Sequence, residues 1–139
     1  YVSRMDNLQA AILNFKLKSL NKVILQRRKN FEIYKKNLSD KVFFPIEKKK
    51  EYNTYHTFVI QVKKRNQLKK YLLKKGITTS IHYPIPIHLQ PAAKNLGYKK
   101  GDFPITESQS KKIITLPIHQ DLKKNDIIRI CKLVNKFVK

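Results

Sequence analysis

The stretch GITTSIHYPIPIHLQP, residues Gly76 to Pro91, joins the end of a strand to a rigid loop that carries reactive side chains. Three hydrogen-bonding side chains stand among three prolines: His82, Tyr83 and His88 among Pro84, Pro86 and Pro91. Because proline lacks a backbone N–H and fixes φ, the loop stays extended and does not pair in a ladder. Binding residues often lie on loops that follow a strand. The stretch predicts a binding site, with a rigid surface loop as the alternative.

The composition is that of one domain. A chain of 139 residues is long enough to bury a core. It has neither an apolar run of about 18 residues nor a signal-peptide pattern, so no membrane span is expected. Cys131 is the only cysteine, which excludes an intrachain disulfide and a cysteine-held metal centre. A reduced, cytoplasmic setting is therefore expected.

The formal charge of +22 is the one feature that favours a small nucleic-acid-binding module. Only five of the 31 basic residues are arginines: Arg4, Arg27, Arg28, Arg65 and Arg129. Direct readers of bases and phosphates usually use the bidentate fork of arginine. The lysines are also spread along the whole chain instead of gathering on one element. A solvated lysine surface is the favoured interpretation, and it would still attract anionic substrates.

A long helix is predicted at the start of the chain. Asp6 and Gln9 have the spacing of a capping box, so the helix should begin near residue 6. The helical stripe comprises Leu13, Leu17, Leu20, Ile24, Phe31, Tyr34 and Leu38. Leu8, Ile12 and Phe15 form a second apolar face at the front end. A helix over 6–38 would be about 48 Å long, and its front end needs further surface to pack on.

The remainder predicts a small α+β layer. Strands are expected over 41–45, 56–62, 77–82 and 113–116. Helices are expected from about 66 to Gly76, over 104–112 and over 124–139. The last helix should turn four side chains inward: Ile127, Cys131, Val134 and Val138. The segment 84–101 is expected to be loop, with one turn near 92–95.

Further motifs agree with the first stretch. The chain opens with SRMDNLQAAIL over 3–13, and it carries GDFP over 101–104 and LPIH over 116–119. In this order and spacing the motifs resemble the C-terminal part of the DegT/DnrJ/StrS-type sugar aminotransferases. The resemblance covers nearly all of this chain but well under half of an enzyme of that family. Since Tyr1 stands inside a motif, the chain is expected to be a fragment, with a large domain upstream.

The resemblance implies the C-terminal small domain of the fold-type I, aspartate-aminotransferase-like, pyridoxal 5'-phosphate (PLP) enzymes. Residues 1–38 would be the connecting and interface helix, and 39–139 the small α/β domain. The parent enzyme would be a homodimer that moves an amino group, from glutamate, to a nucleotide-linked keto sugar. Its product would feed polysaccharide, lipopolysaccharide or deoxyamino-sugar biosynthesis. PLP would be bound mainly by the large domain, which also carries the Schiff-base lysine, so no catalytic or cofactor-binding residue is assigned here.

The resemblance also suggests substrate-binding residues. Arg4 matches an arginine that reaches the neighbouring subunit's site, and an interface salt bridge is its alternative role. His82 and Tyr83 match the family's His-Tyr pair on the loop that approaches the substrate. His88 and Gln90 follow in the matching HLQP pattern, either as ligands or to hold the loop. Val2 replaces an asparagine that contacts the cofactor phosphate, and valine has no amide to donate.

Other polar residues are expected to be structural. His56, in YHTF, is interpreted as a satisfied core residue, and His119, in LPIH, as a loop residue. Asp102 and Glu107 suit the N-terminal turn of a helix.

Three alternatives to an aminotransferase stay open. One is the basic nucleic-acid-binding module, which rests on charge alone. Another is a family relative that dehydrates a sugar, in which histidine replaces the Schiff-base lysine. The last is a regulatory, non-catalytic relative of the same family.

Overall fold

The computed structural model describes residues 4–139, and its N-terminal arm is divided into two helices. α1 spans Asn7–Leu17 and α2 spans Leu20–Asn37, where the sequence predicted one helix over 6–38. Asp6 caps α1 as predicted, with Gln9 N–H donating to Asp6 Oδ1 at 2.8 Å. The break lies at Ser19, whose Oγ donates to the Lys16 carbonyl at 3.0 Å. A serine hydroxyl bonded to a preceding carbonyl competes with the helical ladder, which explains the break.

The sheet has two antiparallel strands, β1 (Phe58–Gln61) and β2 (Ile113–Leu116). Both lie within predicted strands. The predicted strand over 41–45 is reduced to one bridge, between Phe43 and Gln61. Pro45 follows closely and has no N–H to extend that pairing.

The predicted strand over 77–82 is also reduced to one bridge. Ser80 and Thr115 exchange both backbone bonds, with N···O distances of 3.2 and 2.8 Å. Ile77 N–H instead donates to the Leu72 carbonyl at the end of the preceding helix. The first residue of the predicted strand therefore belongs to a helix cap, and the prolines from Pro84 onward exclude further pairing.

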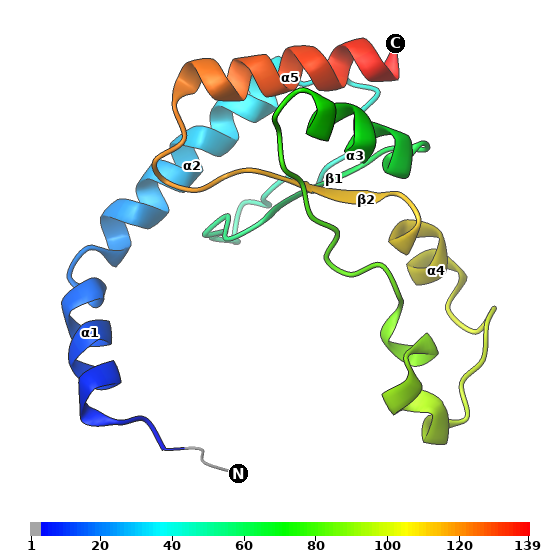
Figure 1. Ribbon diagram of the computed structural model, residues 1–139, viewed down its shortest axis with the longest axis horizontal. Coiled ribbons are helices and arrows are strands. Elements are labelled where there is room, and N and C mark those ends of the chain that lie inside the picture. The colour runs from blue at the N-terminus through cyan, green and yellow to red at the C-terminus, as the bar shows by residue number, and fades with distance from the viewer. Residues whose placement is uncertain (1–3) are drawn as a thin grey trace.

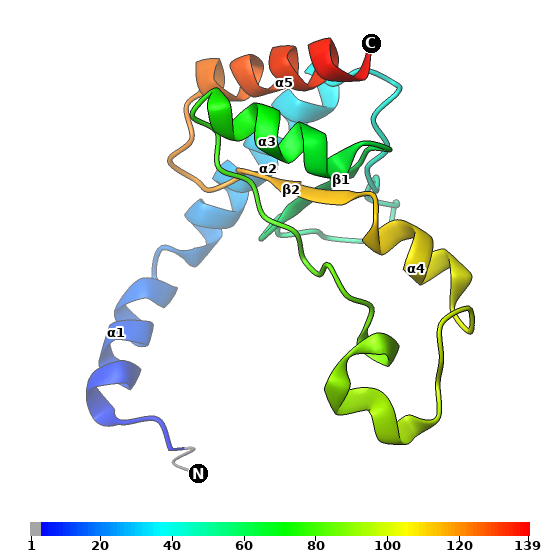
Figure 2. The same ribbon diagram turned by 45° about the vertical axis from the view of Figure 1, so that its right-hand side comes forward.

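Three helices cover one face of the sheet. α3 (Arg65–Lys74) and α5 (Lys124–Val138) lie with α2 on the same side of β1 and β2 (Figures 1 and 2). The core between them is aliphatic and aromatic, with these side chains at most 3% exposed: Phe31, Tyr34, Phe58, Ile60, Leu68, Leu72, Ile114, Leu116, Ile127 and Val134. Gly76, at φ 74°, follows α3 as predicted. In α5, Cys131 is also buried, whereas Val138 is only partly buried.

The predicted loop over 84–101 contains two short 3₁₀ helices, η1 (Ile87–Leu89) and η2 (Pro91–Leu96). α4 (Pro104–Ser110) follows and begins at its proline, as predicted. This segment hangs from one end of the sheet and α1 from the other, so the described chain is arched (Figure 1). Among residues 4–139, the sheet face inside the arch is not covered by a helix (Figure 2).

α1 contributes nothing to this core. None of its residues is buried, and Leu8 and Phe15 are 72% and 76% exposed. The second apolar face predicted for the front end is thus present and uncovered in residues 4–139. No helix in this part of the chain has the length and apolar character needed to cross a bilayer.

Candidate functional site

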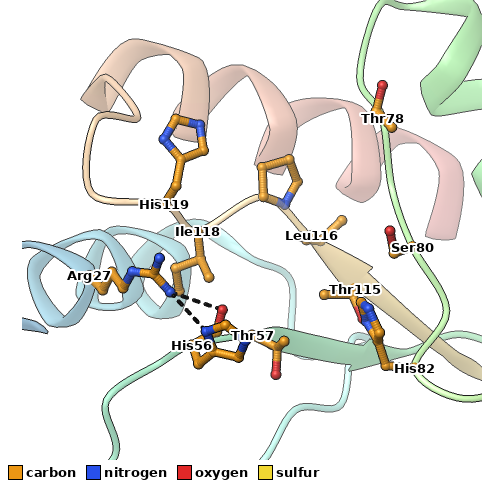
Figure 3. Close-up of a pocket in the computed structure, with 11 residues that line it drawn as sticks. Arg27, His56, Thr57, Thr78, Ser80, His82, Thr115, Leu116, Ile118 and His119 are labelled. Carbon is orange, nitrogen blue, oxygen red and sulfur yellow. Dashed lines mark hydrogen bonds between the residues drawn. The ribbon is translucent and has the colours of Figure 1, made fainter. Parts of the chain in front are cut away.

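An open pocket of about 280 Å³ lies on the inner side of the arch. Figure 3 shows that its walls come from α2, the segment before β1, the segment around Ser80, and β2 with the residues after it. The lining residues are Arg27, His56, Thr57, Thr78, Ser80, His82, Thr115, Leu116, Pro117, Ile118 and His119. Small-molecule sites usually enclose roughly 300–1,000 Å³, so this pocket suits a small acid or one part of a larger ligand.

His82 lies at one end of the pocket. Its Nδ1 is 2.9 Å from Thr115 Oγ1 on β2, so a strand hydroxyl fixes the orientation of the imidazole. Tyr83 is 70% exposed, and its ring meets the His82 ring edge-on with centroids 5.6 Å apart. Both side chains are therefore accessible. An exposed imidazole and phenol can hydrogen-bond to sugar hydroxyls or phosphate oxygens.

Arg27 lies at the other end of the pocket. The sequence patterns did not single out this residue as part of a site. Its Nη1 donates to the His56 carbonyl at 3.1 Å and lies 3.5 Å from His56 Nδ1 (Figure 3). Its Nη2 donates to Gln120 Oε1 at 3.4 Å. One signal was available, because Arg27 fills the gap between Ile24 and Phe31 in the predicted apolar stripe. A charged residue on the inward face of a helix is a candidate for a role beyond solvation.

The interpretation of His56 as a core residue is wrong. β1 begins only at Phe58, so His56 precedes the sheet, and its side chain is exposed and lines the pocket. His119 follows β2 in a loop, as expected, and its exposed ring points away from Arg27 (Figure 3). The loop is held against α2 because Asn30 Nδ2 donates to the His119 carbonyl at 2.8 Å. Tyr34 hydroxyl also donates to the Pro117 carbonyl, at 2.7 Å.

His88 is not in this pocket. It is 9% exposed, and its Nε2 donates to Glu107 Oε1 at 3.1 Å. The Gly101 N–H donates to the same oxygen at 2.7 Å, and these two bonds, with the Gly101 bond the stronger influence, hold the pKa of Glu107 below its usual range. Glu107 stands in the first turn of α4, as predicted. This position favours the loop-holding role for His88, and its contact with substrate stays a prediction.

Arg4 is exposed and stands before α1, the helix that hangs away from the sheet in Figure 1. The structure therefore does not bring Arg4 together with His82 within one chain. Its expected reach into a neighbouring subunit stays a prediction. Val2 lies outside the described residues.

The pocket does not form a PLP site by itself. PLP chemistry requires an amine for the Schiff base and an acid beside the pyridinium nitrogen. Neither a lysine nor a carboxylate is among the residues that line the pocket. The described residues 4–139 also hold no cluster of three or more His, Cys, Asp or Glu side chains suited to a metal ion. The chemistry available here is hydrogen bonding and cationic attraction.

The fold of the described residues matches the C-terminal part of solved aminotransferases. The structure matches that of S. venezuelae DesV in complex with a ketimine intermediate, with a TM-score of 0.93 and 28% identity over 98% of this chain and 37% of DesV. A DegT DnrJ EryC1 StrS aminotransferase from Brucella abortus matches with a TM-score of 0.89 and 31% identity, over 96% of this chain and 36% of that one. The resembled fold is thus confirmed.

The sequence profile of the DegT/DnrJ/EryC1/StrS aminotransferase family matches residues 1–135, and the chain belongs to this family. A pleiotropic regulatory protein of Geobacillus stearothermophilus is 36% identical over 99% of this chain and 38% of its own length. The dTDP-3-amino-3,6-dideoxy-alpha-D-galactopyranose transaminase of Aneurinibacillus thermoaerophilus is 33% identical over 97% of this chain and 37% of its own. The chain thus spans little more than a third of these relatives.

Proposed function

We propose that this chain is the C-terminal part of a PLP-dependent aminotransferase that transfers an amino group from glutamate to a nucleotide-linked keto sugar. The observation that carries the proposal is the match to the DegT/DnrJ/EryC1/StrS aminotransferase family over residues 1–135, a range that includes the loop with His82 and Tyr83. The product would enter polysaccharide, lipopolysaccharide or deoxyamino-sugar biosynthesis. We place the reaction in the cytoplasm, which suits the lone buried thiol of Cys131.

The contribution of this chain is substrate binding. His82, held by Thr115, and the accessible Tyr83 donate and accept hydrogen bonds with the sugar nucleotide. Arg4 pairs with a carboxylate or phosphate in the site of a partner subunit. The amine and acid that PLP requires come from the part of the relatives that this chain does not span. We therefore expect the chain alone to have no transaminase activity.

The proposed assembly is a homodimer. The uncovered apolar side chains of α1, such as Leu8 and Phe15, would pack on the cofactor domain and on the partner subunit. In this division residues 1–38 form the connecting and interface helix, and residues 39–139 form the small domain. Both parts line the pocket, the first through Arg27.

A regulatory, non-catalytic relative is the second candidate. It is favoured by the name of the pleiotropic regulatory protein, which is 36% identical to this chain. A sugar-dehydrating relative would share the fold and would differ at the Schiff-base position. Both alternatives are distinguished from the aminotransferase by residues outside this chain.

The experiment that tests the proposal is to sequence the DNA upstream of the Tyr1 codon and to purify the complete gene product. An open frame with a Schiff-base lysine, and a protein that binds PLP and forms 2-oxoglutarate from glutamate, would support the aminotransferase. Histidine at the lysine position would support sugar dehydration. Absence of such a frame, or sequence-selective binding of nucleic acid without amino transfer, would contradict the proposal.

A further inference from the structure

Two adjacent arginines of α2 differ in how their charges are balanced. Arg28 forms a fork with Glu47, with Nη2–Oε2 at 2.9 Å and Nη1–Oε1 at 3.1 Å. Arg27 is partly buried, and its hydrogen-bonding partners are a carbonyl, an imidazole and an amide, none of which is a carboxylate. Among residues 4–139 no carboxylate lies within ion-pair distance of Arg27. Its Nε is buried and has no partner there.

An uncompensated cation in a partly buried position is costly, since burial removes water and no anion replaces it. The walls around Arg27 do not lower this cost, because none of the residues that line the pocket is acidic. They instead offer hydroxyl and imidazole groups, including those of Thr57, Ser80, His56 and His82. The pocket therefore combines a guanidinium with hydroxyl and imidazole donors, a combination that suits an oxyanion.

We propose that the end of the pocket formed by Arg27 and His56 binds an oxyanion of the substrate. This inference rests on the proposed function. It adds a second contact with the substrate, beside that of His82, and names the group contacted as an oxyanion. In Figure 3 Arg27 and His56 lie together at one end and His82 lies at the other, with Thr57 between them. One ligand can thus place a hydroxyl near His82 and an anionic group near Arg27.

The oxyanion has two sources in the proposed reaction. One source is a carboxylate of the amino donor, which is a small acid and fits as a whole molecule into the volume of about 280 Å³. A phosphate of the sugar nucleotide would enter as one part of a larger ligand. Carboxylate and phosphate present the same paired oxygens to a guanidinium, so the experiment distinguishes them by which substrate responds.

The test uses the complete PLP-loaded gene product with Arg27→Gln and Arg27→Lys, and Arg28→Gln as the matched control. Steady-state kinetics give the KM of glutamate and of the nucleotide sugar separately. Thermal unfolding with glutarate or inorganic pyrophosphate reports binding without turnover. Loss of a charged hydrogen-bonded contact should raise one KM about 10- to 100-fold. Arg27→Lys should retain part of the affinity, since lysine keeps the charge and loses the fork.

A raised KM for glutamate, with glutarate protection lost in Arg27→Gln, assigns the carboxylate. A raised KM for the nucleotide sugar, with pyrophosphate protection lost, assigns the phosphate. Arg28→Gln should lower the unfolding temperature without changing either KM. If neither probe stabilises the unaltered protein, or if both Arg27 variants keep both KM values, the inference is wrong. Probe binding through Arg27 without transamination would instead refute only the proposed function.

Discussion

At the scale of single residues, the position of His82 on its loop depends on Thr115, a residue of the neighbouring strand β2. Thr115 is buried in β2, and its Oγ1 lies 2.9 Å from His82 Nδ1. The backbone bridge between Ser80 and Thr115 brings the two side chains to the same place. The orientation of the imidazole therefore depends on a strand residue 33 positions away in the chain.

Thr115→Val should raise the KM for the nucleotide sugar about 2- to 10-fold, because His82 loses a hydrogen bond of ordinary strength. The KM for glutamate should not change. Kinetics of the complete enzyme measure both values. Thr54→Val, at an exposed position, is the control and should leave both unchanged. Equal sugar KM values in the two variants would show that Thr115 does not position His82.

Glu107 should make the loop that carries His88 sensitive to acid. Its pKa is lowered by the Gly101 N–H bond and then by His88. A lowered folded pKa gives stability above the unfolded value of about 4.3, and this stability is lost as the pH falls through the folded pKa. Thermal unfolding against pH should therefore show Glu107→Gln less stable than the unaltered protein near neutrality. The difference should vanish in acid.

The exposed Glu32 of α2 provides the control for this measurement. Glu32→Gln should follow the unaltered protein across the whole pH range. If the difference in unfolding temperature between Glu107→Gln and the unaltered protein stays constant into acid, the ionised carboxylate is not its cause.

Residue patterns predicted the site only in part. His82, which lines the candidate pocket, could be singled out because the prolines and hydrogen-bonding side chains around it are local features of one loop. Tyr83 follows it but is not among the lining residues, and its role stays a prediction.

Arg27 and His56 could not be singled out, because their meeting requires α2 to pack beside the segment before β1. The helix pattern does not distinguish Arg27 from its neighbour Arg28, since both are partly buried and both stand between Ile24 and Phe31. The pairing of Arg28 with Glu47 depends on tertiary structure.

At the scale of elements, helices were predicted better than strands. α3, α4 and α5 lie close to their predicted ranges because their caps are local: Gly76 after α3, and Pro104 at the start of α4. Strand length instead depends on a partner. The segments around Phe43 and Ser80 each form only a single bridge, although their residue patterns are strand-like. The break at Ser19 was missed since the apolar stripe continues through it.

The stability of the small domain should depend on the sheet–helix core. Ile60 in β1 is 0% exposed, so Ile60→Ala should lower the free energy of unfolding by about 2–5 kcal/mol through lost burial and the cavity left behind. Denaturant unfolding of the complete protein, followed by a probe in this domain, measures the change. Ile105 in α4 is 73% exposed, and Ile105→Ala should change the same free energy by less than about 0.5 kcal/mol. Equal costs would contradict the described core.

At the scale of the whole molecule, α1 is a helix without a core of its own. Its residues are not buried in the described part of the chain, and apolar side chains such as Phe15 project from it. Short helices are marginal in water without tertiary packing. We therefore expect α1 to be stable only where another surface packs on it. The proposed dimer would provide such a surface.

Phe15→Ser should weaken that assembly. Burying a phenylalanine contributes about 1.5–3 kcal/mol, so its loss should raise the dimer dissociation constant at least about tenfold. Sedimentation of the complete protein over a range of concentrations measures this constant. Lys18→Ser, in the exposed turn between α1 and α2, should leave the constant unchanged. A dimer equally tight in both variants would show that Phe15 lies outside the interface.

We propose that this chain binds the sugar nucleotide in an aminotransferase of its family. The most direct test incubates the complete gene product with isotope-labelled glutamate and a panel of nucleotide-linked keto sugars, and follows the mass of the sugars. We predict that one sugar gains the labelled amino group, and that residues 1–139 alone transfer none. A PLP-loaded protein that labels no sugar, or labelling by residues 1–139 alone, would contradict the claim.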